Sequence, residues 1–306
     1  MLVTDNTDIL CAEILCIEEK LRSWSEPKML AGCVTGETPS LASKRGLTCM
    51  AWQGLAHVLY TAVSVDNGKS WSAKREVPGC SCTGAPALCA VNGRFILAWK
   101  EEDNTIRTCY SIDGLNWSNE LVVHHQPTAG NPTFEVVNNT AALSWQETGS
   151  NMVWVSVSKD GFKWATRQEL VYAESQCKPS VSGAYNKDGL YAMIWSGLSR
   201  NNFWISASKN GRVLTPYIEI PGCNAADKPV LAYSHHLDLF YAGWLGMESP
   251  GTIFISWSPN GLWYVPKIDT GLQSQCSPVI IATESGLLMA YRAHTSNNIV
   301  ISSLNL

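Results

Sequence analysis

Short apolar runs separated by polar turns follow one another from Trp24 to the C-terminus. Helical periodicity is absent from these runs, so we expect strands. In one representative unit the predicted strands are Pro86–Val91, Arg94–Lys100, Ile106–Ser111 and Trp117–Val123. The dipeptide Asn92-Gly93 between the first two favours a type I′ hairpin, which needs positive φ at both positions. The pattern predicts a small four-stranded antiparallel sheet.

This four-stranded unit recurs along the chain. A proline opens each copy, at Pro39, Pro86, Pro132, Pro179, Pro229 and Pro278, and an aromatic residue follows, at Trp52, Trp99, Trp145, Trp195, Trp244 and Tyr291. Proline at the first residue of a strand removes no hydrogen bond from the sheet. Four strands in each repeat of 46 to 50 residues are typical of propeller blades. The chain is therefore predicted to be an all-β, six-bladed β-propeller.

The turn between the third and fourth strands carries its own motif, Ser-x-Asp-x-Gly-x-x-Trp or a form one residue shorter. The motif residues expected to be structural are Asp66, Asp113 and Asp160, with Asn210 and Asn260 in weaker copies. An Asp or Asn side chain accepts backbone N–H bonds within its own turn, and glycine takes the positive-φ corner. The tryptophan is expected to pack over the turn.

The two ends of the chain complement each other. The chain stops at Ser303-Leu304-Asn305-Leu306 without a fourth strand, and the missing continuation resembles the segment after Trp24. We therefore predict one propeller domain over residues 23–306, whose last blade is closed by the N-terminal strand, which removes free sheet edges. Residues 1–22 form an extension. Apolar residues at helical spacing favour a short helix over one face of the ring, with an extra strand as the alternative.

Composition narrows the functional classes. The formal net charge is −4 and basic residues form no run, so nucleic acid is not an expected partner. No apolar stretch is long enough to span a membrane, and the N-terminus lacks the basic start of a secretory signal. We expect a cytoplasmic or non-conventionally secreted protein. The eleven cysteines follow no metal-binding spacing, so we expect mostly reduced structural thiols, no metal and no cofactor.

The Ser-x-Asp-x-Gly-x-x-Trp turns resemble the Asp-box motif of sialidases and related propellers. The resemblance covers nearly the whole chain and implies that these turns lie on the face away from the ligand. It also implies three arginines for a sialidase, because arginine binds a carboxylate through two parallel hydrogen bonds. Only Arg107 and Arg292 sit near the loops expected on the ligand face. The incomplete triad argues against sialidase activity, and we assign no catalytic residue.

The repeats also resemble non-catalytic sugar-binding propellers, which implies glycans as partners. Each second strand ends in an aromatic residue followed by a polar or small one. The candidate ligand-binding residues are Trp52, Gln53, Trp99, Lys100, Glu101, Trp145, Gln146, Glu147, Trp195, Trp244, Tyr291 and Arg292. Indole faces match the apolar faces of sugars, and amides and charges match the hydroxyls. The alternative is that these aromatics belong to the core between blades. Several weak sites on one ring would give avidity.

Two other functions stay open. A glycoside hydrolase needs two suitably spaced carboxylates, and the loops offer Glu37, Glu101, Glu102, Glu147, Glu174, Asp227 and Glu248. A protein-interaction scaffold would instead present a broad apolar patch on the same face. The sequence does not select a sugar or an oligomeric state.

Overall fold

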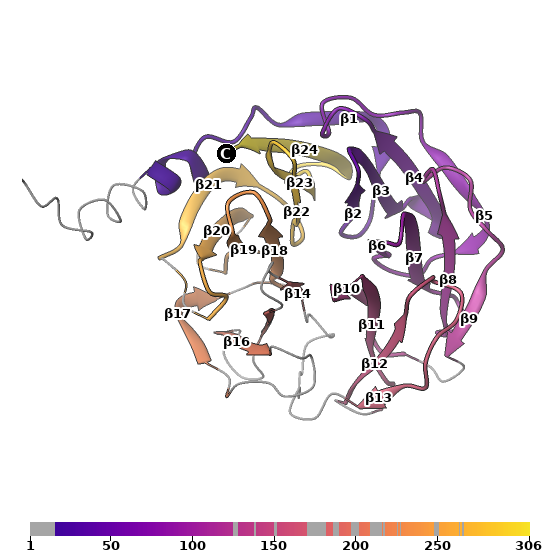
Figure 1. Ribbon diagram of the computed structural model, residues 1–306. Helices are drawn as coiled ribbons and strands as arrows, with labels where there is room; N and C mark the ends of the chain where they lie inside the picture. The colour runs from indigo at the N-terminus through magenta and orange to yellow at the C-terminus, as the bar shows by residue number, and fades with distance from the viewer. Residues whose placement is uncertain are drawn as a thin grey trace, which may run out of the picture.

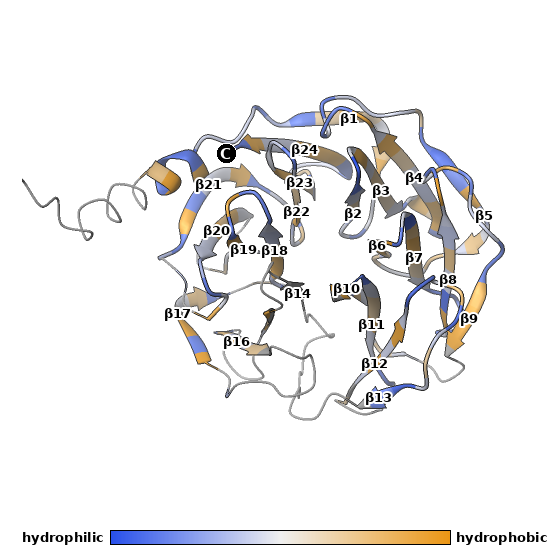
Figure 2. Ribbon diagram, in the orientation of Figure 1, coloured by the Kyte–Doolittle hydropathy of each residue, from blue (hydrophilic) through white to orange (hydrophobic). Residues whose placement is uncertain are grey.

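Six four-stranded antiparallel sheets stand in a ring around a central axis, which confirms the predicted six-bladed β-propeller (Figure 1). The computed structural model describes residues 16–124, 128–137, 139–149, 152–169, 182–185, 190–196, 202–208, 216, 218–224, 226, 228–247, 251–262, 264 and 266–306. Hydrophobic residues concentrate on the strands (Figure 2). Buried side chains of adjacent blades form shared clusters.

We number the blades in chain order, with the innermost strand of each named first. Blade 1 comprises β2 (Ser40–Lys44), β3 (Leu47–Gln53), β4 (Val58–Ser64) and β5 (Arg75–Ser81); blade 2 comprises β6 (Ala87–Val91), β7 (Arg94–Lys100), β8 (Ile106–Ser111) and β9 (Leu121–His124). Blade 3 comprises β10 (Thr133–Val137), β11 (Thr140–Gln146), β12 (Val153–Ser158) and β13 (Gln168–Glu169); blade 4 comprises β14 (Ser182–Tyr185), β15 (Tyr191–Ser196), β16 (Asn202–Ser208) and β17 (Ile218–Asn224). Blade 5 comprises β18 (Val230–Ser234), β19 (Leu239–Leu245), β20 (Thr252–Ser258) and β21 (Ile268–Gln273). Blade 6 comprises β22 (Val279–Thr283), β23 (Gly286–Arg292), β24 (Asn298–Asn305) and the N-terminal β1 (Lys28–Val34).

The ring closes as predicted, because the N-terminal strand completes the last blade. Strand β1 pairs antiparallel with β24, and Lys28 lies opposite Ile301. Just before this strand, the Ser25 N–H donates to the Ser303 carbonyl at 2.8 Å, and the Ser303 N–H donates to Ser25 Oγ at 2.9 Å. Because β1 pairs with β24, blade 6 has four strands, as each of the other blades has.

The N-terminal helix differs in position from its prediction. Residues 16–21 are helical, and the remainder of the extension lies outside the described residues. The helix sits at the rim of the ring beside β21, and not over a face (Figure 1). Leu21 is fully buried there in a cluster that includes Ile268 and Leu272. Packing against β21 buries the apolar side of the helix, so the helix does not cover a face of the ring.

The Ser-x-Asp turns have the local hydrogen bonds that the sequence predicted. Asp113 accepts the N–H groups of Leu115 and Asn116 at 2.9 and 2.7 Å, and Ser111 Oγ accepts the N–H of Gly114. Asp66 and Asp160 are bonded in the same way within their own turns, and so is Asn260. Asn210 lies outside the described residues.

These turns also connect consecutive blades. The indole N–H of Trp117 in blade 2 donates to Thr61 Oγ1 of blade 1 at 3.2 Å, and Trp164 in blade 3 donates to Thr108 Oγ1 of blade 2 at 3.3 Å. A methyl group on Gly114 would lie 2.8 Å from Val63 Cγ1 of blade 1. The turn glycine is therefore required for contact between blades as well as for its positive φ.

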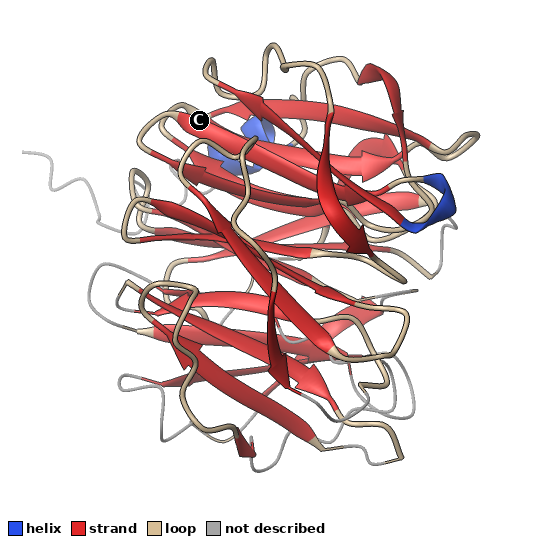
Figure 3. Cartoon of the chain, turned by 90° about the vertical axis from the view of Figure 1, so that its right-hand side faces the viewer, coloured by secondary structure: helices blue, strands red, loops and turns tan. Residues whose placement is uncertain are grey.

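The strands run between two faces of the ring, at which the loops gather (Figure 3). The turn at residues 112–116 joins β8 to β9, and the loop at residues 101–105 joins β7 to β8, so they lie at opposite ends of β8. We call the first face the turn face and the second the loop face. The innermost strands surround a central channel of about 170 Å³, whose lining residues are largely apolar and include Pro39, Pro86, Pro132 and Pro229.

Candidate functional site

Five of the six aromatic residues that end the second strands are buried in the core between blades, which favours the core alternative over sugar platforms. Trp52, Trp99, Trp145, Trp244 and Tyr291 are between 0 and 2% exposed. Each packs against the preceding blade: the Trp99 cluster, for example, contains Cys49 and Ala51 of blade 1. A ring enclosed in this way offers no face to a ligand in solution. Trp195 is half-buried.

The polar residues that follow these aromatics connect one blade to the next loop. Gln53 is buried, and its Nε2 donates to the Cys82 carbonyl at 2.6 Å. Arg292, at the same repeat position in blade 6, donates to the Gly36 carbonyl at 2.9 Å and also to Asn297. Gln146 is buried and Lys100 is half-buried. At two of these predicted ligand-binding positions, Gln53 and Arg292, the side chain therefore forms a hydrogen bond to the backbone of a neighbouring loop.

A second set of repeat positions, which the sequence reading missed, lies on the third and fourth strands. The aromatic of the second strand is paired across the sheet with Tyr60 in blade 1, Arg107 in blade 2, Trp154 in blade 3, Trp204 in blade 4 and Phe254 in blade 5. In three blades the residue directly before the fourth strand is a cation that lies over this ring, 4.1 to 5.1 Å from the ring centroid. The pairs are Lys74 over Tyr60, Arg167 over Trp154 and Lys267 over Phe254. Such stacking is a favourable cation–π contact.

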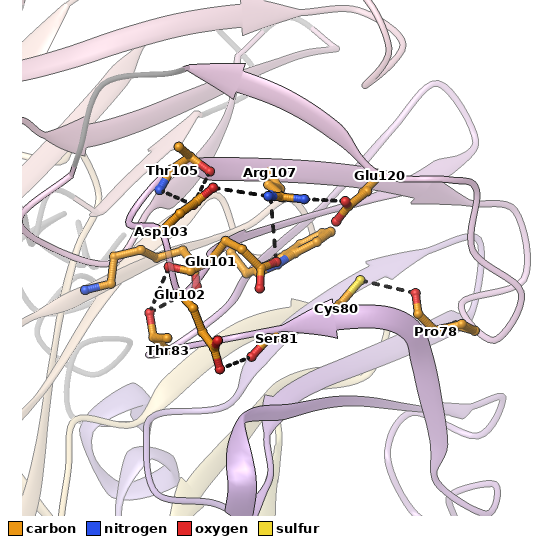
Figure 4. Close-up of polar contacts among 12 residues, drawn as sticks. Pro78, Cys80, Ser81, Thr83, Glu101, Glu102, Asp103, Thr105, Arg107 and Glu120 are labelled. Atoms are coloured by element: carbon orange, nitrogen blue, oxygen red, sulfur yellow. Dashed lines mark hydrogen bonds and ion pairs between the residues drawn. The ribbon is translucent and has the colours of Figure 1, made fainter.

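In blade 2 the aromatic ring is replaced by a cation, and the cation is replaced by an acid. Arg107 takes the place of the ring, and Glu120 takes the place of the stacked cation and forms an ion pair with Arg107. Asp103 Oδ2 lies 3.2 Å from Arg107 Nη2, and Glu101 Oε2 lies 3.8 Å from its Nε. Figure 4 shows the three carboxylates around the guanidinium. Three acids on one arginine make this position unlike its equivalents.

This cluster faces the fourth strand of blade 1. Ser81, the last residue of β5, donates from its hydroxyl to Glu102 Oε1 at 2.8 Å, and Cys80 lies beside it (Figure 4). Burial raises the pKa of the Cys80 thiol to about 12, and the nearby Glu120 carboxylate adds to the rise. We call the group Cys80, Ser81, Glu101, Glu102, Asp103, Arg107 and Glu120 the blade 1–2 seam.

Glu101 is the most informative residue of the seam. It is only 8% exposed, and its Oε2 accepts the Trp99 indole N–H at 2.8 Å. Its Oε1 has no hydrogen-bond partner within the part of the chain that the structure describes, and it keeps access to solvent. In blade 1 the equivalent residue is Gly54, because the Tyr60 ring lies where a side chain would stand, 2.6 Å from a Cβ. A mostly buried carboxylate is costly, so an unpaired oxygen there is available to a ligand.

The charges of the seam are fixed by its contacts. The Thr105 hydroxyl and then its backbone N–H lower the pKa of Asp103, and Arg107 contributes further. Desolvation acts to lower the pKa of Arg107, but the hydrogen bond with Asp103 and the charges of Glu120 and Glu101 outweigh it and raise that pKa. Exposed ion pairs contribute little to stability, so the cluster adds little to holding the fold. It positions polar groups instead.

The loop of blade 1 beside this seam has strained backbone. Ala56 and His57, in the 3-10 turn η1 (Leu55–His57), both have φ near +63°. Left-handed backbone costs a residue with a side chain about 1 to 2 kcal/mol. The loop is held by the Cys82 N–H, which donates to the His57 carbonyl at 2.8 Å. Such strain gathers where the surrounding structure fixes a loop for a purpose other than stability.

Of the remaining predicted loop acids, the structure describes Glu37 and Glu147. Glu147 forms an ion pair with Arg167 at 2.8 Å in blade 3. Glu37 lies in the loop before β2, while Glu174, Asp227 and Glu248 lie outside the described residues. Arg107 faces three carboxylates and Arg292 is held by Gly36 and Asn297, so neither guanidinium is presented to an anionic ligand.

Other site classes find no support in the described part of the chain. It contains no group of three or more His, Cys, Asp or Glu residues arranged to hold a metal ion. Its nine cysteines form no disulfide. No helix within the same residues has the length and apolar character needed to cross a membrane.

Known structures of similar fold include sialidases and lectins. A Hadza microbial sialidase superposes with a TM-score of 0.63 at 14% identity, covering 88% of this chain and 65% of the sialidase. The fungal Aleuria aurantia lectin, a six-bladed propeller that recognises fucose, superposes with a TM-score of 0.65 at 8% identity, covering 92% of this chain and 97% of the lectin. A lectin from Burkholderia pseudomallei gives 0.60 at 9% identity, covering 78% of this chain and 72% of the lectin.

The chain therefore spans about two thirds of the length of the sialidase that it resembles. No protein-family model and no curated protein sequence matches the chain. At these identities the structural likeness establishes the six-bladed propeller fold alone, and any function has to be argued from the chemistry of the site.

Proposed function

We propose that the protein is a non-catalytic carbohydrate-binding propeller, whose ligands bind on the loop face at the seams between blades. The observation that carries the proposal is the blade 1–2 seam. There a nearly buried carboxylate, Glu101, keeps one oxygen free beside the guanidinium of Arg107. Sugars present hydroxyl groups that both donate and accept, and a carboxylate next to an arginine supplies both counterparts.

The fold supports this proposal in a second way. The chain superposes on a six-bladed lectin that recognises fucose, with a TM-score of 0.65 over 92% of its length. The repeat positions that vary between blades lie at the seams, so the six seams are not equivalent. We infer that only some of them bind sugar and that multivalency arises from a subset of blades.

The test is a glycan array followed by titration of the strongest ligand by calorimetry. Glu101→Gln and Arg107→Ala should each weaken binding by about 10- to 100-fold, because hydrogen bonds to charged groups contribute about 1.5 to 3 kcal/mol. Arg75→Ala is the matched control, since Arg75 is exposed and bonds Asn116 of the turn at residues 112–116. Absence of binding to every glycan, or equal affinity of Glu101→Gln and wild type, would contradict the proposal.

A glycoside hydrolase is the second candidate, because the seam brings Glu101, Asp103 and Glu120 around one arginine and two carboxylates suffice for this chemistry. Release of the aryl group from a panel of aryl glycosides, including sialosides, would establish it. If Glu101→Gln abolished that release, the carboxylate would be catalytic and the lectin proposal would fail.

A further inference from the structure

The charges of the blade 1–2 seam determine which sugars it can accept. The seam holds four carboxylates, from Glu101, Glu102, Asp103 and Glu120, and one guanidinium, from Arg107. Lys100, directly before Glu101 in the chain, adds one cation, so two negative charges remain uncompensated. The guanidinium, which in isolation would attract an acidic sugar, is already surrounded by three of the carboxylates. The local potential is therefore negative although an arginine lies at its centre.

The free oxygen of Glu101 also restricts which ligand groups can bind beside it. An ionised carboxylate only accepts hydrogen bonds, so the ligand atom that meets it must be a donor. A sugar hydroxyl fulfils this requirement, and a protonated amine fulfils it with the additional attraction of opposite charges. A sugar carboxylate or sulfate offers no donor at neutral pH and is repelled by the same charges.

From this geometry, and resting on the proposed function, we infer that the blade 1–2 seam selects sugars that carry a free amine over neutral sugars, and neutral sugars over acidic ones. Despite the likeness of the fold to sialidases, sialic acid is an unfavourable ligand for this site. The selection comes from the acids of blade 2, since the corresponding positions in blades 1, 3 and 5 carry an aromatic ring under a cation.

The inference is tested with methyl glycosides of glucose, galactose and mannose, each in its neutral, 2-amino and 6-uronic form. Binding to the full-length protein is measured at pH 6.5 in low salt, with sialyllactose as a further acidic probe. A unit charge about 7 Å from two opposite charges in water changes affinity roughly sevenfold, so we expect a ratio of about 50 between the amino and uronic forms. At 0.5 M NaCl the ratio should fall towards unity for this exposed site.

Variants separate the charge effect from the hydrogen bonds. Glu102→Gln removes one of the two excess charges but keeps the shape of the side chain, so the ratio should fall to about 7. Glu284→Gln is the matched control, because Glu284 is exposed in the hairpin between β22 and β23 and so lies on the turn face of blade 6. It should leave the ratio unchanged.

Three results would overturn the inference. Equal affinity for amino and uronic forms would contradict it while leaving sugar binding intact, and so would a ratio that Glu102→Gln does not change. Failure of all the glycosides and of sialyllactose to bind would remove the proposed function together with the inference.

Discussion

Replacing Gly114 by alanine tests whether the Ser-x-Asp turns hold neighbouring blades together. Gly114 has φ of +75°, and a Cβ at this position would lie 2.8 Å from Val63 Cγ1 and 3.0 Å from Cys49 Sγ, both in blade 1. Positive φ costs alanine about 1 kcal/mol. Forcing a methyl group into a packed interface costs about 1 to 3 kcal/mol more. We expect a total loss of about 3 kcal/mol.

Gly93 provides a matched control for the backbone contribution. Its φ is +74°, almost identical to that of Gly114, but a Cβ there would meet no atom within 4 Å. Gly93→Ala should therefore cost only about 1 kcal/mol, the backbone contribution alone. The difference of about 2 kcal/mol between the two variants measures the contact between blades.

The assay is equilibrium unfolding in urea, followed by tryptophan fluorescence, with the midpoints compared at equal slope. Adding Val63→Ala to Gly114→Ala removes the clashing methyl group and should recover part of the loss. If Gly114→Ala and Gly93→Ala had equal effects, the turn glycine would serve only its own backbone, and the assignment of these turns as links between blades would be refuted.

Three further predictions follow from the same contacts. Trp117→Phe and Thr61→Val should each destabilise the protein, and a double-mutant cycle on thermal stability should give a coupling of about 1 kcal/mol, the usual net value of one hydrogen bond. Burial acts to raise the pKa of Asp113, but the N–H groups of Asn116 and Leu115 outweigh it and hold that pKa well below its usual value. The ionised Asp113 side chain therefore stabilises the fold fully above about pH 4, and this stabilisation is lost as the pH falls towards 2. In thermal melts across this range, the difference in melting temperature between wild type and Asp113→Asn should become smaller as the pH is lowered. Burial raises the pKa of the Cys82 thiol to about 12, so a thiol reagent at pH 8 should label Cys82 only after unfolding, as mass spectrometry of the labelled peptides would show.

The architecture was readable from the sequence because each blade repeats the same local signals. Proline at the start of a strand, Asn92-Gly93 at a hairpin and the Ser-x-Asp turns each depend on neighbouring residues, and their spacing gave the six blades and their closure. The helix over residues 16–21 lies within the predicted segment, but it packs at the rim of the ring instead of over a face. The spacing of its apolar residues does not determine which part of the ring they contact.

The site was harder to predict, because burial depends on the neighbouring blade. Trp99 has the same sequence context whether its ring meets solvent or Ala51 of blade 1, so the hydropathy pattern could not choose between platform and core. The position of Arg107 depends on the register of β7 with β8. One signal was nevertheless available: aligning the repeats sets Glu120 against Lys74, Arg167 and Lys267, and a charge reversal at one repeat position marks a blade with a different task.

The two faces of the ring tolerate substitution differently for a physical reason. On the turn face, glycine and tryptophan from each described Ser-x-Asp-Gly turn of blades 2 and 3 insert against the preceding blade, so substitutions there disturb two blades at once. On the loop face, the third- and fourth-strand side chains near the seams reach solvent, where exchange of an aromatic–cation pair for an ion cluster costs the fold little. Substitutions are therefore tolerated at the seams and destabilising at the turns, which is why blade 2 can carry a cluster of acids around Arg107 while the ring stays closed.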